Sequence, residues 1–289
     1  MADDRVARFA AAESGPLIAM STVVPQVAAP DTAAVHISAE KVGKIYPAHD
    51  GEVVALREVS IGIRTGEFLS MLGPSGCGKS TFMLLVAGLE PPTSGQIAID
   101  GQPVTQPVTD VGIVFQEHGL YDWRTILGNI MLQGEIRRLP LGPLEVRARE
   151  LLRRTALEEF AAKYPHELSG GMRQRAAICR ALVHDPSLLL FDEPFGALDA
   201  LTRVQMQIDL EKLWLQRRQT VLFITHSIAE AVALSDRVVI MSPRPGQIDE
   251  VLTIDLPRPR DKAVVASKRF AEYCDAITER FMARGIIRY

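Results

Sequence analysis

Residues 73–81 have the composition and spacing of a loop that binds phosphate groups. Their sequence, Gly-Pro-Ser-Gly-Cys-Gly-Lys-Ser-Thr, matches the pattern G-x-x-x-x-G-K-[ST]. Backbone N–H groups of such a loop surround phosphates, the lysine amine reaches the β- and γ-phosphates, and the Ser80 hydroxyl binds Mg²⁺. The predicted nucleotide-binding residues of this loop are Gly73, Pro74, Ser75, Gly76, Cys77, Gly78, Lys79, Ser80 and Thr81.

The segments on either side of this loop favour phosphate binding over a simple connecting turn. Residues 68–72 are apolar and predict a buried strand, and residues 81–87 predict a helix. The order strand, glycine loop, helix is the context in which this pattern binds phosphate, because the helix N-terminus adds partial positive charge.

Two adjacent carboxylates, Asp192 and Glu193, follow the apolar run 188–191. If the strand continues through them, their side chains point to opposite faces. We assign Asp192 to Mg²⁺ and Glu193 to the attacking water as general base. The alternative is an acidic cap before the turn at Pro194.

Gln116 and His226 each end a predicted strand, over residues 111–115 and 220–225. Sites in open α/β sheets form at the carboxyl ends of strands, so both side chains are candidates for the nucleotide site. His226 could donate to the γ-phosphate and orient Glu193, whereas a purely structural histidine is the more common case for such a position.

Two further regions are candidates for contact with nucleotide. Ser169, Gly170 and Gly171 begin a predicted helix through Leu182, and a helix start of this composition can bind an anion. Tyr46 lies between predicted strands over residues 35–39 and 53–63, where its ring could stack on a base or anchor a loop. Asp199 lies in a loop before a predicted helix through Trp214.

Composition limits the function classes. The 289 residues include 32 Lys and Arg and 35 Asp and Glu, so there is no basic surface that would predict nucleic-acid binding. Three cysteines without paired spacing predict neither a disulfide framework nor a zinc site. No apolar run reaches the roughly 18 residues that cross a bilayer, and residues 1–34 predict a flexible extension, not a signal peptide.

Helical periodicity appears in two other regions. Residues 125–157 predict a helical layer with an apolar stripe, and the arginines off that stripe, Arg147 and Arg149 among them, predict a solvated face. Residues 261–289 predict an amphipathic helix that docks onto its own chain. The apolar stripe of this helix consists of Phe270, Tyr273, Cys274, Ile277 and Phe281.

Taken in order along the chain, these features resemble an ABC-type ATPase cassette over about residues 35–260. The resemblance implies an α/β P-loop NTPase fold: a mostly parallel core sheet, an antiparallel β layer and a helical subdomain over about residues 117–184. It also implies roles for the candidate residues. Walker A is 73–81, the Q-loop glutamine that senses γ-phosphate and Mg²⁺ is Gln116, the signature is 168–172, Walker B is 188–192, the catalytic glutamate is Glu193, the D-loop contains Asp199, the switch histidine is His226, and the adenine-stacking aromatic is Tyr46.

Within this superfamily the segments 164–175, 192–199 and 242–246 look most like the ATP-binding subunits of nitrate, sulfonate and taurine importers. Residues 117–123 lack the proline often found there, and residues 1–34 have no family counterpart. We also expect Tyr121 and Trp123, in the loop after Gln116, to contact a membrane partner or to pack inside the helical layer.

The resemblance implies that ATP with Mg²⁺ binds between two copies arranged head to tail, each closing its signature over the other's Walker A. It further implies a separate membrane permease, an extracytoplasmic solute-binding protein, and a peripheral position on the cytoplasmic face of the inner membrane. The alternatives are a soluble ABC ATPase acting on nucleic acid or ribosomes and a P-loop kinase. The latter leaves residues 169–172 unexplained.

Overall fold

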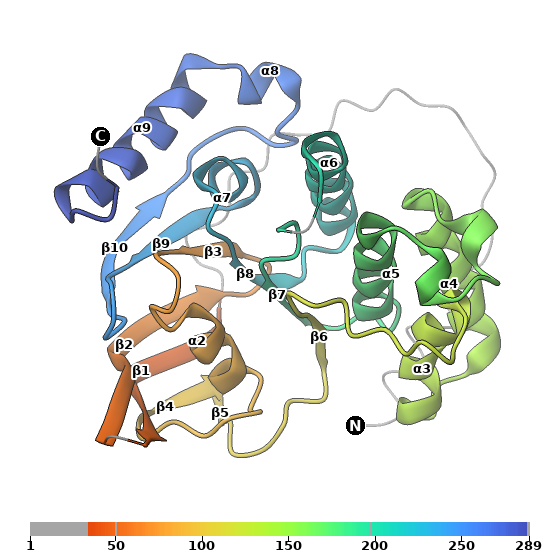
Figure 1. The fold of residues 1–289 in the computed structure, drawn as a ribbon, viewed down its shortest axis with the longest axis horizontal. Coiled ribbons are helices and arrows are strands. Elements are labelled where there is room, and N and C mark those ends of the chain that lie inside the picture. Colours follow the sequence, from red (N-terminus) through yellow and green to blue (C-terminus); the bar gives the residue numbers. More distant parts are fainter. Residues whose placement is uncertain (1–33, 50, 197, 288–289) are drawn as a thin grey trace.

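The computed structural model describes residues 34–49, 51–196 and 198–287. A six-stranded sheet forms its centre, in the order β10-β9-β3-β8-β7-β6 (Figure 1). The strands from β9 to β6 pair in parallel, and β10 joins antiparallel at one edge. These strands are β3 (Phe68–Leu72), β6 (Val111–Val114), β7 (Leu188–Asp192), β8 (Thr220–Ile224), β9 (Arg237–Met241) and β10 (Ile248–Thr253).

A second, antiparallel sheet has the order β2-β1-β4-β5. Its strands are β1 (Val35–Ala48), β2 (Gly51–Arg64), β4 (Ser94–Ile99) and β5 (Gln102–Pro103). The short strand predicted over 35–39 extends through Tyr46 to Ala48, because β1 pairs with β2 along its whole length despite several register shifts. The two sheets confirm the predicted mostly parallel core with an antiparallel layer.

Alternating residues of β3 explain how the layers assemble. Phe68 packs with Phe223 and with Trp214 of α6 (Ala200–Arg217) on one face of the core sheet. Leu69 and Met71 pack on the other face with α2 (Lys79–Val86) and with residues of β1 and β2. All five β3 residues are buried, as expected for a parallel strand covered on both sides.

A group of three helices lies beside β6 and β7, on the side away from α2 (Figure 1). They are α3 (Ile126–Arg137), α4 (Leu141–Arg154) and α5 (Gly170–Leu182). The helical run predicted over 125–157 is therefore broken, because Arg138 takes a left-handed conformation with φ 55° and Pro140 follows it. The arginines of α4 are mostly exposed, as predicted, and they also pair with acids, for example Arg149 with Glu145 at 2.7 Å and the half-buried Arg147 with Asp185 at 2.8 Å.

The C-terminal part of the described chain covers the β9 end of the core sheet. It contains α7 (Ile228–Leu234), α8 (Lys262–Val265) and α9 (Lys268–Ala283), so the predicted terminal helix is two helices. The stripe of α9 packs against α7 and β9, which confirms docking onto its own chain. Within the described ranges no helix is both long and apolar enough to cross a membrane. The predicted extension falls almost wholly in residues 1–33, outside the described ranges.

Candidate nucleotide-binding and hydrolysis site

The strand order brings most of the predicted site to one edge of the core sheet. β3 leads into the loop 73–81, its neighbour β8 ends before His226, the next strand β7 ends at Asp192, and β6 follows. Because these strands are parallel, their carboxyl ends meet at the same edge. We call the loop 73–81 together with Asp192, Glu193 and His226 the carboxyl edge.

The phosphate loop depends on two glycines in left-handed conformations. Gly76 has φ 74° and Gly78 has φ 101°, values that side chains rarely adopt. A Cβ atom at Gly78 would also lie 2.6 Å from the Leu56 side chain. Gly78 is the N-cap of α2 and provides no side-chain acceptor to the first helical turn. The helix start is thus built to offer its N–H groups to an anion.

Lys79 places its amine inside this loop. Lys79 Nζ donates to the carbonyl oxygens of Gly73 at 2.8 Å and Pro74 at 3.0 Å, and lies 3.9 Å from Cys77 Sγ. The residue is only 6% exposed. A buried cation surrounded by the loop backbone provides the positive charge that a polyphosphate needs.

Ser80 and Asp192 form the part of the edge that suits a magnesium ion. Ser80 Oγ donates to Asp192 Oδ1 at 3.1 Å. Burial raises the pKa of Asp192, while the Ser80 hydrogen bond opposes this shift. Among the described residues no three His, Cys, Asp or Glu side chains converge into a metal cluster. One hydroxyl and one carboxylate fit Mg²⁺, which usually keeps waters and phosphate oxygens as its other ligands.

Glu193 and His226 are brought together by neighbouring strands. His226 Nδ1 lies 3.1 Å from Glu193 Oε2. The strand β7 ends at Asp192, so it does not continue through Glu193. Glu193 instead turns with φ 46°, and its N–H donates to the Ile224 carbonyl at 2.9 Å. Phe195, two residues beyond Glu193 in the same turn, is buried against Phe223 with ring centroids 5.6 Å apart. A left-handed conformation costs a residue other than glycine about 1 kcal/mol or more, and the turn that holds Glu193 in it is anchored in the core at Phe195.

The signature turn, residues 168–172, begins α5 as predicted but does not join the carboxyl edge. Ser169 is the N-cap and accepts a hydrogen bond from the Met172 N–H at 3.3 Å. A Cβ atom at Gly170 would meet nothing within 4 Å, and one at Gly171 would lie near Leu198 and Thr202. No hydrogen bond or ion pair among the described residues links this turn to the loop 73–81.

Asp199 has a local structural role in this chain. Its side chain accepts from the N–H groups of Leu201 at 3.1 Å and Thr202 at 3.0 Å, and so caps α6. Hydrogen bonds from Thr202 and the helix backbone lower the pKa of Asp199. Contact of this aspartate with nucleotide stays a prediction.

Two predicted residues form no hydrogen bond or ion pair with the carboxyl edge within the described ranges. Gln116 is exposed and lies two residues beyond the carboxyl end of β6, the strand beside β7. Tyr46 is half-buried in β1, and the Lys44 amine lies 4.8 Å from its ring centroid. Lys44 also donates to Glu90 at 3.0 Å, so one face of the Tyr46 ring already contacts the protein. Adenine stacking stays a prediction.

The loop after Gln116 holds two aromatic rings at the surface. Tyr121 and Trp123 have ring centroids 4.8 Å apart and are 40% and 74% exposed, so they do not pack inside the helical layer. The buried Asn129 side chain accepts from the Tyr121 N–H at 2.7 Å and donates to three carbonyls of the loop. Arg180 of α5 donates to the carbonyls of Gly119 and His118. The loop is thus fixed from below while its rings face outward.

Sequence reasoning missed a brace behind the phosphate loop, formed by residues 244–246. A Cβ atom at Gly246 would lie 1.9 Å from the Cys77 carbonyl oxygen. The Gly246 N–H donates to the Ala55 carbonyl at 2.9 Å, and Arg244 Nε donates to the Gly76 carbonyl at 3.3 Å. The Ser-Pro-Arg-Pro-Gly run was a signal of family resemblance, but its contact with the loop depends on tertiary structure.

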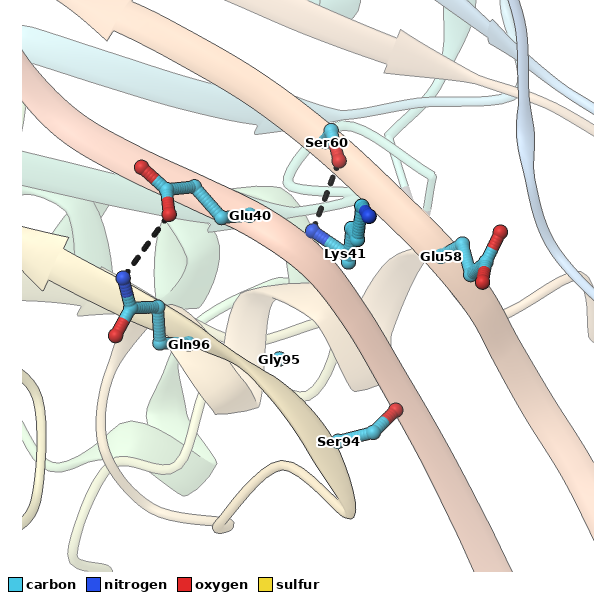
Figure 2. Close-up of a pocket in the computed structure, with 7 residues that line it drawn as sticks. All are labelled: Glu40, Lys41, Glu58, Ser60, Ser94, Gly95 and Gln96. Carbon is cyan, nitrogen blue, oxygen red and sulfur yellow. Dashed lines mark hydrogen bonds between the residues drawn. The ribbon is translucent and has the colours of Figure 1, made fainter.

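A wide depression of about 840 Å³ lies elsewhere, where β1, β2 and β4 meet (Figure 2). It is lined by polar side chains such as Glu40, Glu58 and Gln96 and by none of the predicted site residues. Lys41 and Glu58 take left-handed conformations there, with φ 48° and 51°, near register shifts of the β1–β2 pair. Irregular strand pairing explains this depression without a ligand.

Comparison with known proteins agrees with this geometry. A family model described as ABC transporter matches residues 56–196. The chain is 44% identical to the uncharacterized ABC transporter ATP-binding protein MJ0412 of Methanocaldococcus jannaschii, over 84% of this chain and 90% of that protein. It is 40% identical to the aliphatic sulfonates import ATP-binding protein SsuB of Bacillus cereus, over 87% of this chain and 98% of that protein.

Solved structures are similar in fold. The dimeric, post-hydrolysis ATP-binding cassette MJ0796 bound to ADP and Pi superposes with a TM-score of 0.68 at 33% identity, covering 75% of this chain and 98% of that one. The cassette cbiO1 of Clostridium perfringens has a TM-score of 0.67 at 26% identity, covering 88% and 99%. The chain therefore belongs to the ABC transporter family, as an ATP-binding subunit with an ATPase cassette.

Proposed function

We propose that this chain powers the import of a small solute of the nitrate, sulfonate or taurine kind by hydrolysing Mg-ATP beneath a separate membrane permease. The observation that carries the hydrolytic part is the pairing at the carboxyl edge: Ser80 with Asp192 at 3.1 Å and Glu193 with His226 at 3.1 Å, beside the loop 73–81. The importer part is supported by similarity to the aliphatic sulfonates import protein.

The roles of the residues follow from their chemistry. The N–H groups of the loop 73–81 and the Lys79 amine bind the phosphates, and Ser80 and Asp192 hold Mg²⁺, which neutralises phosphate charge when bound. Glu193 accepts the proton of the attacking water, and His226 holds the Glu193 carboxylate in place. Gln116 senses the γ-phosphate and Mg²⁺, and Tyr46 stacks on the adenine.

A second copy completes the site in this proposal. The exposed signature turn, with Ser169, Gly170 and Gly171, closes over the phosphate loop of the partner copy, and Asp199 lies at the same interface. The dimeric state of the similar MJ0796 cassettes supports this arrangement. The separation of the signature turn from its own carboxyl edge is what a shared site requires.

The remaining partners are membrane components. We place the chain on the cytoplasmic face of the inner membrane, with Tyr121 and Trp123 facing the permease and a solute-binding protein on the other side. The exposed, anchored rings support this, because aromatic side chains contribute disproportionately to interfaces. Nucleic acid is not among the proposed partners, given the net charge of -3.

Phosphate release by the purified chain tests the hydrolytic part. The wild type should hydrolyse Mg-ATP without a phosphorylated acceptor, and Glu193→Gln should bind ATP, hydrolyse it about 10²- to 10⁴-fold more slowly, and accumulate an ATP-dependent dimer. Near-normal turnover by Glu193→Gln would contradict the assignment of Glu193 as the general base. A phosphorylated acceptor would favour a kinase.

Affinity purification from membranes of the native host tests the importer part. We expect a multi-span permease to copurify, and Trp123→Ala to weaken its recovery while phosphate release without the permease is retained. Copurification of ribosomes or nucleic acid in place of a permease would favour the alternative ABC ATPase.

A further inference from the structure

The turn that carries His226 is held from behind by a buried carboxylate, Glu230 of α7. Thr225 Oγ1 donates to Glu230 Oε2 at 2.5 Å, and the Ser227 N–H donates to Thr225 Oγ1 at 3.0 Å. The Glu230 N–H donates to Ser227 Oγ at 3.3 Å. Residues on both sides of His226 are therefore tied, directly or through Thr225, to one acidic side chain.

This matters because His226 is not fixed by packing. Its side chain is 58% exposed, and it forms a hydrogen bond with Glu193. An exposed ring takes its position from the backbone that carries it. The backbone here is the turn 225–227, so the distance between His226 and Glu193 depends on the Glu230 contacts.

Glu230 also faces the first turn of α6, which follows the Asp199 loop. Arg203 Nε lies 3.7 Å from Glu230 Oε1, an ion pair without a hydrogen bond. The same guanidinium donates to the Leu198 carbonyl at 3.1 Å, and the Arg203 N–H donates to the Asp199 carbonyl at 2.9 Å. Arg203 thus joins the Asp199 loop to Glu230, and α6 and α7 lie side by side (Figure 1).

Among the contacts that join the Asp199 loop to the His226 turn through Glu230, the Arg203–Glu230 ion pair has the longest distance. The buried Arg203 Nε has no hydrogen-bond partner, whereas the Thr225 and Ser227 bonds are well formed. A shift of the Asp199 loop toward α7 would shorten the ion pair, and a shift away would break it. Burial of Glu230 strengthens such an interaction, because the pair is poorly screened by water.

We propose that Glu230 and Arg203 form a positioning pair that transmits the position of the Asp199 loop to the Glu193–His226 pair. This rests on the proposed function, in which the Asp199 loop faces a second copy and Glu193 activates water. Neither residue touches nucleotide. Both act by placing His226, and hence Glu193, so that hydrolysis responds to the arrival of the partner copy.

The test measures ATP hydrolysis by the full chain, with kcat separated from KM. Glu230→Ala removes the Thr225 acceptor and should lower kcat about 10- to 100-fold, with the KM for ATP changed less than about twofold. Glu230→Gln keeps an acceptor for Thr225 and should recover part of the loss. Arg203→Met should resemble Glu230→Gln, and the double variant Arg203→Met with Glu230→Gln should be no slower than either single one.

A matched ion pair separates positioning from stability. Glu67 and Arg237 are 3.3 Å apart, Glu67 is as buried as Glu230, and neither is in the site. Glu67→Ala should lower the melting temperature as Glu230→Ala does, with kcat within about twofold of wild type. The proposal of a positioning pair would be overturned if Glu67→Ala and Glu230→Ala lost kcat equally, or if folded Glu230→Ala had a normal kcat. It would also be overturned if the kcat losses of the single variants Arg203→Met and Glu230→Gln multiplied in the double variant.

The outcome also separates this inference from the proposed function. If wild type hydrolyses ATP, Glu193→Gln does not, and Glu230→Gln and Glu230→Ala match wild type, then the positioning pair is wrong and the function stands. If wild type releases no phosphate from ATP at any protein concentration, the proposed function itself fails.

Discussion

The carboxyl edge and the signature turn are both rich in glycine and both lie at helix starts, but they differ in what they contact. At the edge, Ser80 meets Asp192 and Glu193 meets His226 across neighbouring strands. In the signature turn, Ser169 only caps its own helix, and a side chain at Gly170 would meet nothing within 4 Å. The carboxyl edge is therefore assembled by contacts within one chain, whereas the signature turn has a surface without such contacts among the described residues.

The largest expected effect is in the assembled region. Lys79→Ala removes the cation that lies within the phosphate loop, so we expect kcat/KM for ATP to fall about 10²- to 10³-fold. Nucleotide binding by the monomer, measured by fluorescence or calorimetry, should weaken as well. Unchanged binding would contradict the assignment of the phosphate site to this loop.

Gly170→Asp should separate the two regions. The new side chain has free space in the monomer, so the fold and ATP binding should persist, while its charge opposes phosphates held by a partner copy. We expect kcat to fall about 100-fold. Gly142→Asp is a matched control, since that helical glycine is equally unobstructed and lies outside the site.

Mixing the Lys79→Ala and Gly170→Asp chains tests whether the two regions form one site between two copies. A dimer of Lys79→Ala with Gly170→Asp contains one intact composite site, built from the loop of one chain and the signature turn of the other. Phosphate release should therefore recover on mixing, to a fraction of wild type. No recovery, with heterodimers demonstrated by cross-linking, would mean that each chain hydrolyses ATP alone.

A smaller effect is expected behind the loop. Gly246→Ala forces a Cβ atom to within 1.9 Å of the Cys77 carbonyl, so the loop must shift. Overpacking of this kind costs about 1–3 kcal/mol, which predicts roughly tenfold weaker ATP binding and a lower melting temperature. Gly62→Ala, whose Cβ would find ordinary contact at 3.6 Å, is the control and should leave both unchanged.

The smallest effect concerns thiol reactivity. Burial raises the pKa of Cys77, and burial raises that of Cys179 to about 12, so both thiols stay protonated at neutral pH. Because the thiolate is the reactive form, labelling should be slow and should rise with pH beyond the usual thiol range. Cys274 is less buried and should react first. Mass spectrometry of each site tests this order, and Mg-ATP should slow Cys77 further.

Local sequence was informative wherever a function needs consecutive residues. The phosphate loop with its strand and helix, the Ser169 start of α5, and the strands ending before His226 and at Asp192 could be read because composition and spacing specify them directly. The parallel pairing of those strands then placed Ser80 near Asp192, as the α/β pattern predicts.

Other features needed the fold. β1 runs through Tyr46 because β2 pairs with it throughout, although the sequence predicted a strand over residues 35–39 alone. Glu193 leaves its strand at a turn whose Phe195 is buried in the core. The brace at Gly246 and the contact of Arg203 with Glu230 join segments that are far apart in the sequence. Such contacts depend on packing between distant segments, which periodicity and spacing do not record.

The sequence by itself determined which residues we propose for the chemistry of this protein: a loop for phosphates, a hydroxyl and a carboxylate for Mg²⁺, and a glutamate for water. These depend on residue types at fixed spacing, which a chain specifies locally. Tertiary structure alone decided that the signature turn lies away from its own phosphate loop and that Arg203 lies beside Glu230. Both follow from how helices pack on the core sheet, and that packing is set by the whole hydrophobic core.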